Sequence, residues 1–209
     1  MLCDAAGSLG VVVDIAAVEE AIPAMYRYYE QLFKEDNSIW GDDNRAINIW
    51  MLMYEYLCEL VGIPEVGPEV AKIGYTAYLK AGSWELFDDV MPTLDALKSQ
   101  GISLGIISNW DSSLQGIIDG MGIMPYFDTL ICSAVVGLHK PQTEIFKLAL
   151  DEMGVEKSET LYVGDHMDAD IKGALKAGIT PVLIDRHARF KDGEGYIRIQ
   201  NLEEILKYL

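Results

Sequence analysis

The feature that most constrains the fold of this chain is an alternation of short apolar strands with amphipathic helices in its C-terminal half. The strand-like runs cover residues 102–107, 129–132, 161–163 and 181–184, and helical periodicity fills 112–120, 141–153 and 168–177. Strands at this spacing need crossover connections, which favour parallel pairing and helices on both faces of the sheet. We therefore predict an α/β fold with a Rossmann-like, doubly wound, mostly parallel sheet.

The pattern between residues 14 and 87 is purely helical. Apolar residues recur at helical spacing in the runs AVEEAIPAMYRYYEQLF, NIWMLMYEYLCELVGI and GPEVAKIGYTAYLKAG, without a strand-like run between them. We predict an all-helical cap domain over 14–87, inserted into a core formed by 1–13 and 88–209. The Tyr, Trp and Met side chains of this segment are interpreted as its packed interior.

The charge balance limits the classes of partner. The 209 residues include 33 acidic and 16 basic side chains, which gives a formal net charge of -17. Such a field repels phosphate backbones and anionic membrane surfaces, so neither nucleic acid nor a membrane is an expected partner. A small phosphorylated molecule stays compatible, because a local Lys or a divalent cation reverses the sign inside one cleft. Nothing in the composition indicates an oligomeric state.

The cysteines indicate a reducing compartment. Cys3, Cys58 and Cys132 are an odd and widely spaced set without a CxxC motif, so neither a disulfide framework nor a zinc site is expected. No apolar run approaches the about 20 residues of a membrane span, and no charged segment followed by an apolar one opens the chain. We expect a cytoplasmic protein.

The first candidate motif is a carboxylate near the N-terminus, in the run Asp4-Ala5-Ala6-Gly7-Ser8. Small residues after Asp4 let the backbone turn sharply and approach a ligand. An ordinary loop carboxylate is the alternative interpretation. Only three residues precede Asp4, whereas strands usually have about 5 to 6, so the first strand is expected to be minimal or truncated.

Two further motifs offer groups that hold an anion. Ser108 and Asn109 follow the first apolar run, where a strand meets a helix. Lys140 precedes the helical stretch that begins near residue 141, in the run GLHKP. Ser108 as a helix N-cap and Lys140 as a solvated surface charge are the alternatives.

The last motif is a pair of carboxylates at one strand end. Asp165 ends the run LYVGD and Asp170 follows five residues later. Hard oxygen ligands of this kind suit Mg²⁺, which binds through one or two carboxylates plus phosphate oxygens. The alternative is an acidic helix start, in which Asp168 and Asp170 stabilise the helix dipole.

Together, in this order, the four motifs resemble the haloacid dehalogenase-like superfamily of hydrolases, and the helical insertion resembles the small cap of that superfamily. The resemblance implies that Asp4 is the nucleophile, forming an aspartyl-phosphate intermediate, and that Ser108, Asn109 and Lys140 bind the phosphoryl group. It also implies a Mg²⁺ cofactor. The implied ligands are the Asp4 carboxylate, the Ala6 carbonyl, Asp165 and Asp170.

The chain departs from this family at Ala6, where the phosphatases carry an Asp that serves as general acid and base. Such catalysis contributes about 10² to 10⁴-fold, so we expect weakened turnover of alkyl phosphates. Three alternatives stay open: His166 as a substitute proton carrier, a phosphonate hydrolase-like enzyme, and a regulatory protein that binds Mg²⁺ and phosphate but turns over slowly. The phosphonate reaction needs a Schiff-base lysine in the cap, for which the candidates are Lys34, Lys72 and Lys80.

Overall fold

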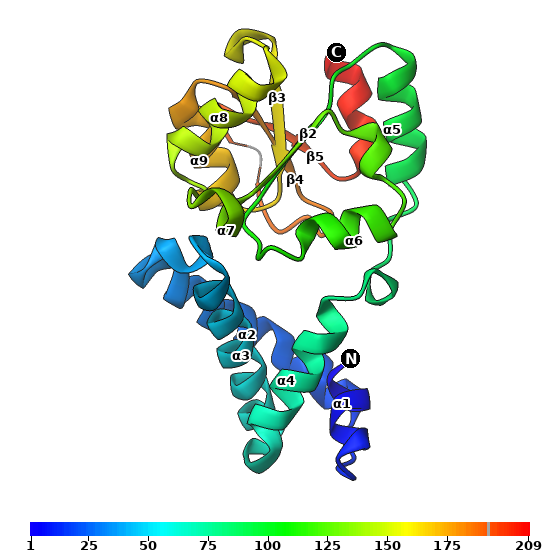
Figure 1. The fold of residues 1–209 in the computed structure, drawn as a ribbon, viewed down its shortest axis with the longest axis vertical. Helices are drawn as coiled ribbons and strands as arrows, with labels where there is room; N and C mark the ends of the chain where they lie inside the picture. Colours follow the sequence, from blue (N-terminus) through cyan, green and yellow to red (C-terminus); the bar gives the residue numbers. More distant parts are fainter. Residues whose placement is uncertain (192) are drawn as a thin grey trace.

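The computed structural model describes residues 1–191 and 193–209, and it has two parts that stack along the long axis of the molecule (Figure 1). An α/β core holds all the strands, and a group of helices from the N-terminal half lies beneath it. The prediction of an α/β fold with a helical cap is therefore confirmed.

The core strands are parallel, but they form two sheets rather than one. β1 (Gly105–Ser108) pairs with β2 (Thr129–Cys132), and Ile107 lies opposite Ile131. β3 (Leu161–Gly164) pairs with β4 (Thr180–Ile184), which also pairs with β5 (Ile197–Ile199), a strand that the sequence pattern did not predict.

Helices cover the two faces of these sheets, as a doubly wound topology requires. α8 (Thr143–Met153) and α9 (Lys172–Ala177) lie on one side, where Phe146 and Ala174 are fully buried against Ile131 of β2 (Figure 1). On the other side α5 (Val90–Ser99) and a C-terminal 3-10 helix (Leu202–Tyr208) bury Val182 and Ile199. The remaining core helices are α6 (Leu114–Gly120) and α7 (Ser133–Val136).

The adjoining edges of the two sheets are β1 and β3, which are not hydrogen-bonded to each other. Side chains bridge them instead: the Ile107 carbonyl of β1 accepts hydrogen bonds from the Lys140 ammonium at 3.1 Å and the Tyr162 hydroxyl of β3 at 3.4 Å. Every residue of β3 is half-buried, whereas Val182 and Leu183 in β4 are fully buried. The predicted parallel pairing is confirmed, and the strands are divided between a two-stranded and a three-stranded sheet that these side-chain hydrogen bonds connect.

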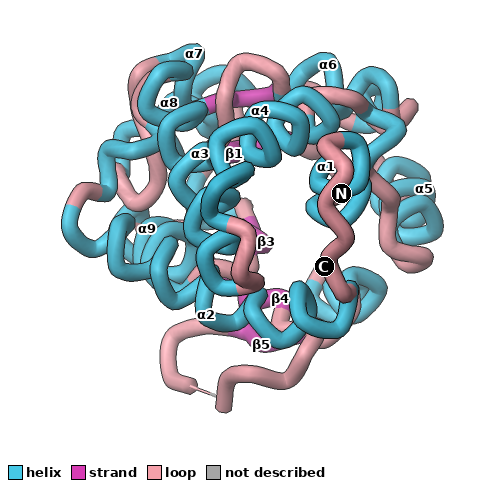
Figure 2. The backbone as a smooth tube through the Cα atoms, turned by 90° about the horizontal axis from the view of Figure 1, so that it is seen from below, coloured by secondary structure: helices cyan, strands magenta, loops and turns pink. Residues whose placement is uncertain are grey.

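The cap is an antiparallel helical unit with its own apolar interior. α2 (Ile15–Glu35), α3 (Asp43–Leu60) and α4 (Gly67–Tyr78) form it, and α3 packs closely on both others (Figure 2). The interior includes Leu57, Cys58 and Val70, in agreement with the interpretation of this segment as a packed core. No helix among the described residues is both long enough and apolar enough to cross a membrane.

The N-terminal segment, which was expected to contribute a strand to the core, packs against the cap helices. Residues 2–8 form helix α1 instead of the expected strand. Leu2, Ala5 and Ala6 lie at helical spacing and are buried against cap residues, Tyr54 and Leu57 among them. Burial of that stripe against the cap favours a helix, and Leu and Ala are strong helix formers.

Candidate functional site

The candidate site lies where β1 and β3 end, and its centre is Lys140. The Lys140 side chain is buried, with 11% of its surface exposed, and its ammonium lies 2.7 Å from Oδ1 of Asp170. The same nitrogen donates to the Tyr162 hydroxyl at 2.9 Å and to the Ile107 carbonyl at 3.1 Å. An ammonium has three N–H donors, so all of them are used in this state. Lys140 is thus not the solvated surface charge of the alternative interpretation.

Asn109 holds the Lys140 backbone against the end of β1. Its Oδ1 accepts from the Lys140 N–H at 2.8 Å, and its Nδ2 donates to the Lys140 carbonyl at 2.9 Å. This reciprocal pair occupies the side-chain amide, so Asn109 positions Lys140. The predicted direct contact of Asn109 with a phosphoryl group is not favoured by this arrangement.

Asp170 closes the site from the other side. Its Oδ1 accepts from Lys140 and, at 3.1 Å, from the Tyr162 hydroxyl, while its Oδ2 accepts from the His166 N–H at 3.0 Å. Asp170 sits in a π-helical turn (Met167–Ile171) that crosses the end of β3. A side chain at Gly164 would overlap the Asp170 carboxyl group, so glycine is required there. Asp168, by contrast, pairs with Lys172 on the surface.

Tyr162 is a site residue that the sequence reasoning missed. It lies in β3, and its ring packs against Phe146 with centroids 4.9 Å apart. A tyrosine inside a strand gives no sequence signal of a polar role, because that role depends on the direction in which its hydroxyl points.

Ser108 and Asp165 complete the strand ends. Ser108 is half-buried at the end of β1, six residues before α6 begins, so the N-cap interpretation is wrong. Asp165 is exposed directly after β3. Of the predicted magnesium ligands, it is the one whose carboxylate lies at a strand end and is not engaged by Lys140.

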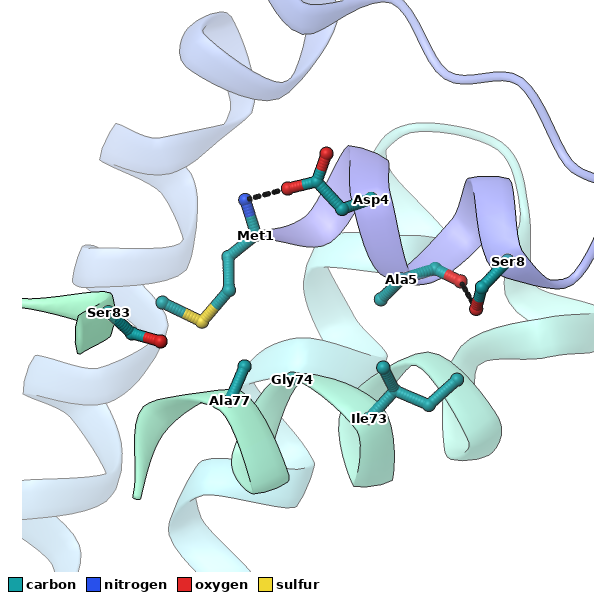
Figure 3. A pocket seen from close by; sticks show the side chains of 8 residues that line it. All are labelled: Met1, Asp4, Ala5, Ser8, Ile73, Gly74, Ala77 and Ser83. Atoms are coloured by element: carbon teal, nitrogen blue, oxygen red, sulfur yellow. Dashed lines mark hydrogen bonds and ion pairs between the residues drawn. The ribbon is translucent and has the colours of Figure 1, made fainter. Parts of the chain in front are cut away.

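The structure contradicts the predicted placement of Asp4 and Ala6 at the strand ends. Asp4 lies in α1, far below the sheets in Figure 1, with 89% of its side chain exposed and 3.0 Å from the N-terminal ammonium. A cavity of about 370 Å³ between α1 and α4 is lined by Asp4, and Figure 3 shows Asp4 next to Met1. The Ala6 carbonyl accepts from the N–H groups of Leu9 and Val11, so it is occupied within the backbone.

The predicted four-ligand magnesium set is therefore not assembled. Two of its members lie in the cap, and Asp170 uses both carboxylate oxygens for Lys140, Tyr162 and the His166 N–H. Among residues 1–191 and 193–209, no group of three or more His, Cys, Asp or Glu side chains is arranged to hold a metal ion.

The cap contacts the site through three residues of α2, which lie against His166. His166 lies against the Phe33 ring at 5.3 Å and the Tyr29 ring at 6.5 Å, and its Nε2 is 3.2 Å from a Glu30 oxygen. His166 Nδ1 accepts from the N–H groups of Asp168 and Ala169, which places its ring proton on Nε2, facing Glu30 without the orientation of a formed hydrogen bond. His166 thus anchors the acidic turn to the cap, and its role as proton carrier gains no support.

A second contact joins the cap to the loop before α6. The Asp43 carboxylate accepts from both the N–H and the hydroxyl of Ser112 at 2.7 Å, and Tyr75 donates to the buried Asp111 at 3.1 Å.

The three cap lysines that the sequence offered as Schiff-base candidates are Lys34, Lys72 and Lys80, and all of them are exposed. A Schiff-base lysine of lowered pKa needs a desolvated position, so the phosphonate hydrolase alternative has no support in these residues.

The electrostatics of the Lys140–Asp170 pair hold both groups in their charged forms. Burial alone would lower the pKa of Lys140, but the Asp170 carboxylate and the Tyr162 hydroxyl override it and raise that pKa. Burial likewise opposes ionisation of Asp170, whereas Lys140 and the His166 N–H lower its pKa below the ordinary value. The pair is therefore ionised at neutral pH.

This pair predicts an acid-labile contribution to stability. Because the pKa of Asp170 is lower in the folded chain, its contribution is complete above the unfolded value of about 3.9 and is lost as pH falls through the folded value. The raised pKa of Lys140 acts oppositely, and its contribution is lost only as pH rises through the folded value. Urea unfolding between pH 7 and 3 should show a shallower acid loss for Asp170→Asn than for the native chain. Equal slopes would contradict the pairing.

Comparison with known proteins shows a similarity to one family of hydrolases over most of the chain. The family model of haloacid dehalogenase-like hydrolases matches residues 18–184. Haloacid dehalogenase-like hydrolase domain-containing protein 3 of Danio rerio is 29% identical over 194 residues, which are 92% of this chain and 78% of that protein. Phosphoserine phosphatase of Thermus thermophilus is 28% identical over 188 residues, 88% of this chain and 73% of that protein.

A solved structure extends the likeness to three dimensions. The crystal structure of an HAD phosphatase from Thermococcus onnurineus superposes with a TM-score of 0.63 and 26% identity, and the match covers 99% of this chain and 86% of that chain. The match therefore includes both the α/β core and the helical cap.

Proposed function

Because this chain belongs to the haloacid dehalogenase-like hydrolase family, we propose that it is a phosphohydrolase-type enzyme that binds a small phosphorylated metabolite at the ends of β1 and β3. The observation that carries the proposal is the buried Lys140 ammonium, which lies between the end of β1 and the acidic turn after β3. The phosphatase names of two similar proteins support a phosphate ester as the substrate class.

Binding of a phosphoryl group requires Lys140 to exchange partners. The Ile107 carbonyl and the Tyr162 hydroxyl are neutral acceptors, whereas a phosphate oxygen is charged and forms a hydrogen bond roughly twice as strong. A phosphate oxygen therefore displaces one of them, while Asp170 keeps the ammonium in place. The Ser108 hydroxyl at the end of β1 supplies a second donor.

The proposed chemistry contains no step through Asp4 or Ala6. An aspartyl intermediate at Asp4 and a proton-transfer defect at Ala6 both required these residues to lie beside Lys140, and they lie in α1 instead. This displacement favours the second candidate function, a protein that binds phosphate and turns it over slowly. A screen of phosphorylated metabolites distinguishes the two: phosphate release identifies the enzyme, and thermal stabilisation without release identifies the binding protein.

Magnesium enters the proposed function through Asp165 alone. Mg²⁺ binds through as few as one carboxylate when phosphate oxygens complete its coordination, and it would neutralise charge on the phosphoryl group. The exposed Asp165 carboxylate at the end of β3 is the residue that would hold it.

The Asp165 assignment predicts a binding effect that does not depend on turnover. Mg²⁺ should tighten the binding of inorganic phosphate to the native chain, and Asp165→Asn should remove that increase while leaving metal-free phosphate binding unchanged. Calorimetric titrations with and without Mg²⁺ measure both quantities. Asp168→Asn is the matched control, since Asp168 pairs with Lys172 on the surface. A magnesium effect that survives in Asp165→Asn would refute the assignment.

A further inference from the structure

The segment of the cap that reaches the site is short and approaches it from two sides. Gly41 lies beside His139, the residue before Lys140, since a side-chain carbon at Gly41 would come within 3.7 Å of the His139 ring. Tyr29 and Phe33 lie against His166, whose N–H holds Asp170. The cap segment between residues 29 and 41 therefore spans the Lys140–Asp170 pair.

A hydrogen bond inside this segment fixes the direction of one hydroxyl. Trp40, which is buried, donates its indole N–H to the Tyr29 hydroxyl at 3.0 Å. Within the described residues the Tyr29 hydroxyl donates its own proton to no group, so one hydrogen-bond donor is left over. The Phe33 ring packs on the Tyr29 ring at 6.1 Å and limits its rotation.

The Lys140–Asp170 pair of the core influences the pKa of the Tyr29 hydroxyl in the cap. Burial raises the pKa of Tyr29 to about 12, Trp40 and Lys140 lower it, and Glu30 and Asp170 raise it. The hydroxyl is accordingly protonated at neutral pH and available as a donor.

We propose that Tyr29 is a ligand-binding residue of the cap, which donates a hydrogen bond to the organic part of the phosphorylated ligand, and that Trp40 positions it. The inference rests on the proposed function, because it takes the phosphoryl group to lie at Lys140. The Tyr29 ring lies beside His166, whose backbone N–H holds Asp170, so an ester substituent that extends from a phosphate at Lys140 toward the cap would meet the Tyr29–Trp40 pair. The ligand class is a small phosphate ester with an acceptor oxygen, such as a hydroxyl or carboxylate, near the phosphate.

The test compares a ligand that has an organic part with one that lacks it. Dissociation constants of the native chain are first measured for inorganic phosphate and for three esters: glycerol 3-phosphate, 3-phosphoglycerate and phosphoserine. The ester that binds most tightly is then used for the variants. Tyr29→Phe should weaken that ester about three- to tenfold, the value of one hydrogen bond, and leave phosphate binding within about twofold. Tyr26→Phe, which removes an exposed hydroxyl from the same helix, should change neither.

A spectroscopic readout separates contact from a general change in structure. The indole N–H resonance of Trp40, assigned through Trp40→Phe, should shift on addition of the ester and not on addition of phosphate. If Tyr29→Phe weakens both ligands equally, or neither, the ligand-binding role is wrong while the proposed function stands. If the native chain binds neither phosphate nor any of the esters, the proposed function fails, and this inference fails with it.

Discussion

Lys140→Met should destabilise the folded chain by about 3–5 kcal/mol and abolish phosphate binding. The methionine keeps the apolar stem but removes the ammonium, which leaves the Asp170 carboxylate buried without its charged partner. Removal of one partner of a buried ion pair has a cost of this size because the remaining charge is desolvated and uncompensated. Urea unfolding monitored by circular dichroism gives the free energy of unfolding, and titration with inorganic phosphate gives the affinity.

Two variants make the result specific to the buried pair. Lys172→Met removes a lysine from the exposed pair with Asp168 and should change stability by less than about 1 kcal/mol. The double variant Lys140→Met/Asp170→Asn removes both charges and should recover most of the stability, since the new amide side chain is neutral, but none of the phosphate affinity. A Lys140→Met variant no less stable than Lys172→Met would show that the site is not the buried ionic unit described above.

Gly164→Ala should weaken phosphate binding by at least about tenfold and destabilise the chain by about 1–3 kcal/mol. An alanine methyl group at this position would overlap the Asp170 carboxyl group, so the acidic turn has to move away from β3. Because Asp170 holds the Lys140 ammonium, that movement displaces the phosphate-binding group as well.

Gly116→Ala is the matched control for this substitution. Gly116 lies inside α6 with no neighbouring atom within 4 Å of the added carbon, and alanine is the better helix former, so stability should be unchanged or slightly increased. Phosphate affinity should equal that of the native chain. Native-like phosphate binding by Gly164→Ala would mean that the position of Asp170 does not control Lys140.

The local pattern was sufficient to predict most elements of the core. β2 covers the predicted residues 129–132, and α8 ends at Met153, directly before Gly154, which takes the left-handed conformation that stops a helix. Strand and helix periods are properties of neighbouring residues, so they are visible in the sequence. β5 was missed because three residues give too short a period to detect.

The meeting of Lys140 with Asp170 was also predictable in outline. Both follow strands, and parallel strands bring their carboxyl ends to one edge of the fold. The positions of Lys140 and Asp170 after strands were therefore enough to predict that they lie at the same edge. The hydrogen bonds of Asn109 to the Lys140 backbone and of Lys140 to Tyr162 depend on side-chain directions, which residue spacing does not encode.

What the sequence determined by itself was the class of fold, the helical cap and the order of the polar motifs, because each follows from periodicity or from residues close in the chain. Tertiary structure decided the rest. Asp4 stands in a run that is compatible with a turn after a strand, but the cap offers an apolar surface to Leu2, Ala5 and Ala6, and burial of that stripe places Asp4 on an exposed helix. The contacts of the cap segment around Tyr29 and Gly41 with the loops around Lys140 and Asp170 likewise join residues far apart in the chain, and only the packing of the cap on the core brings them together.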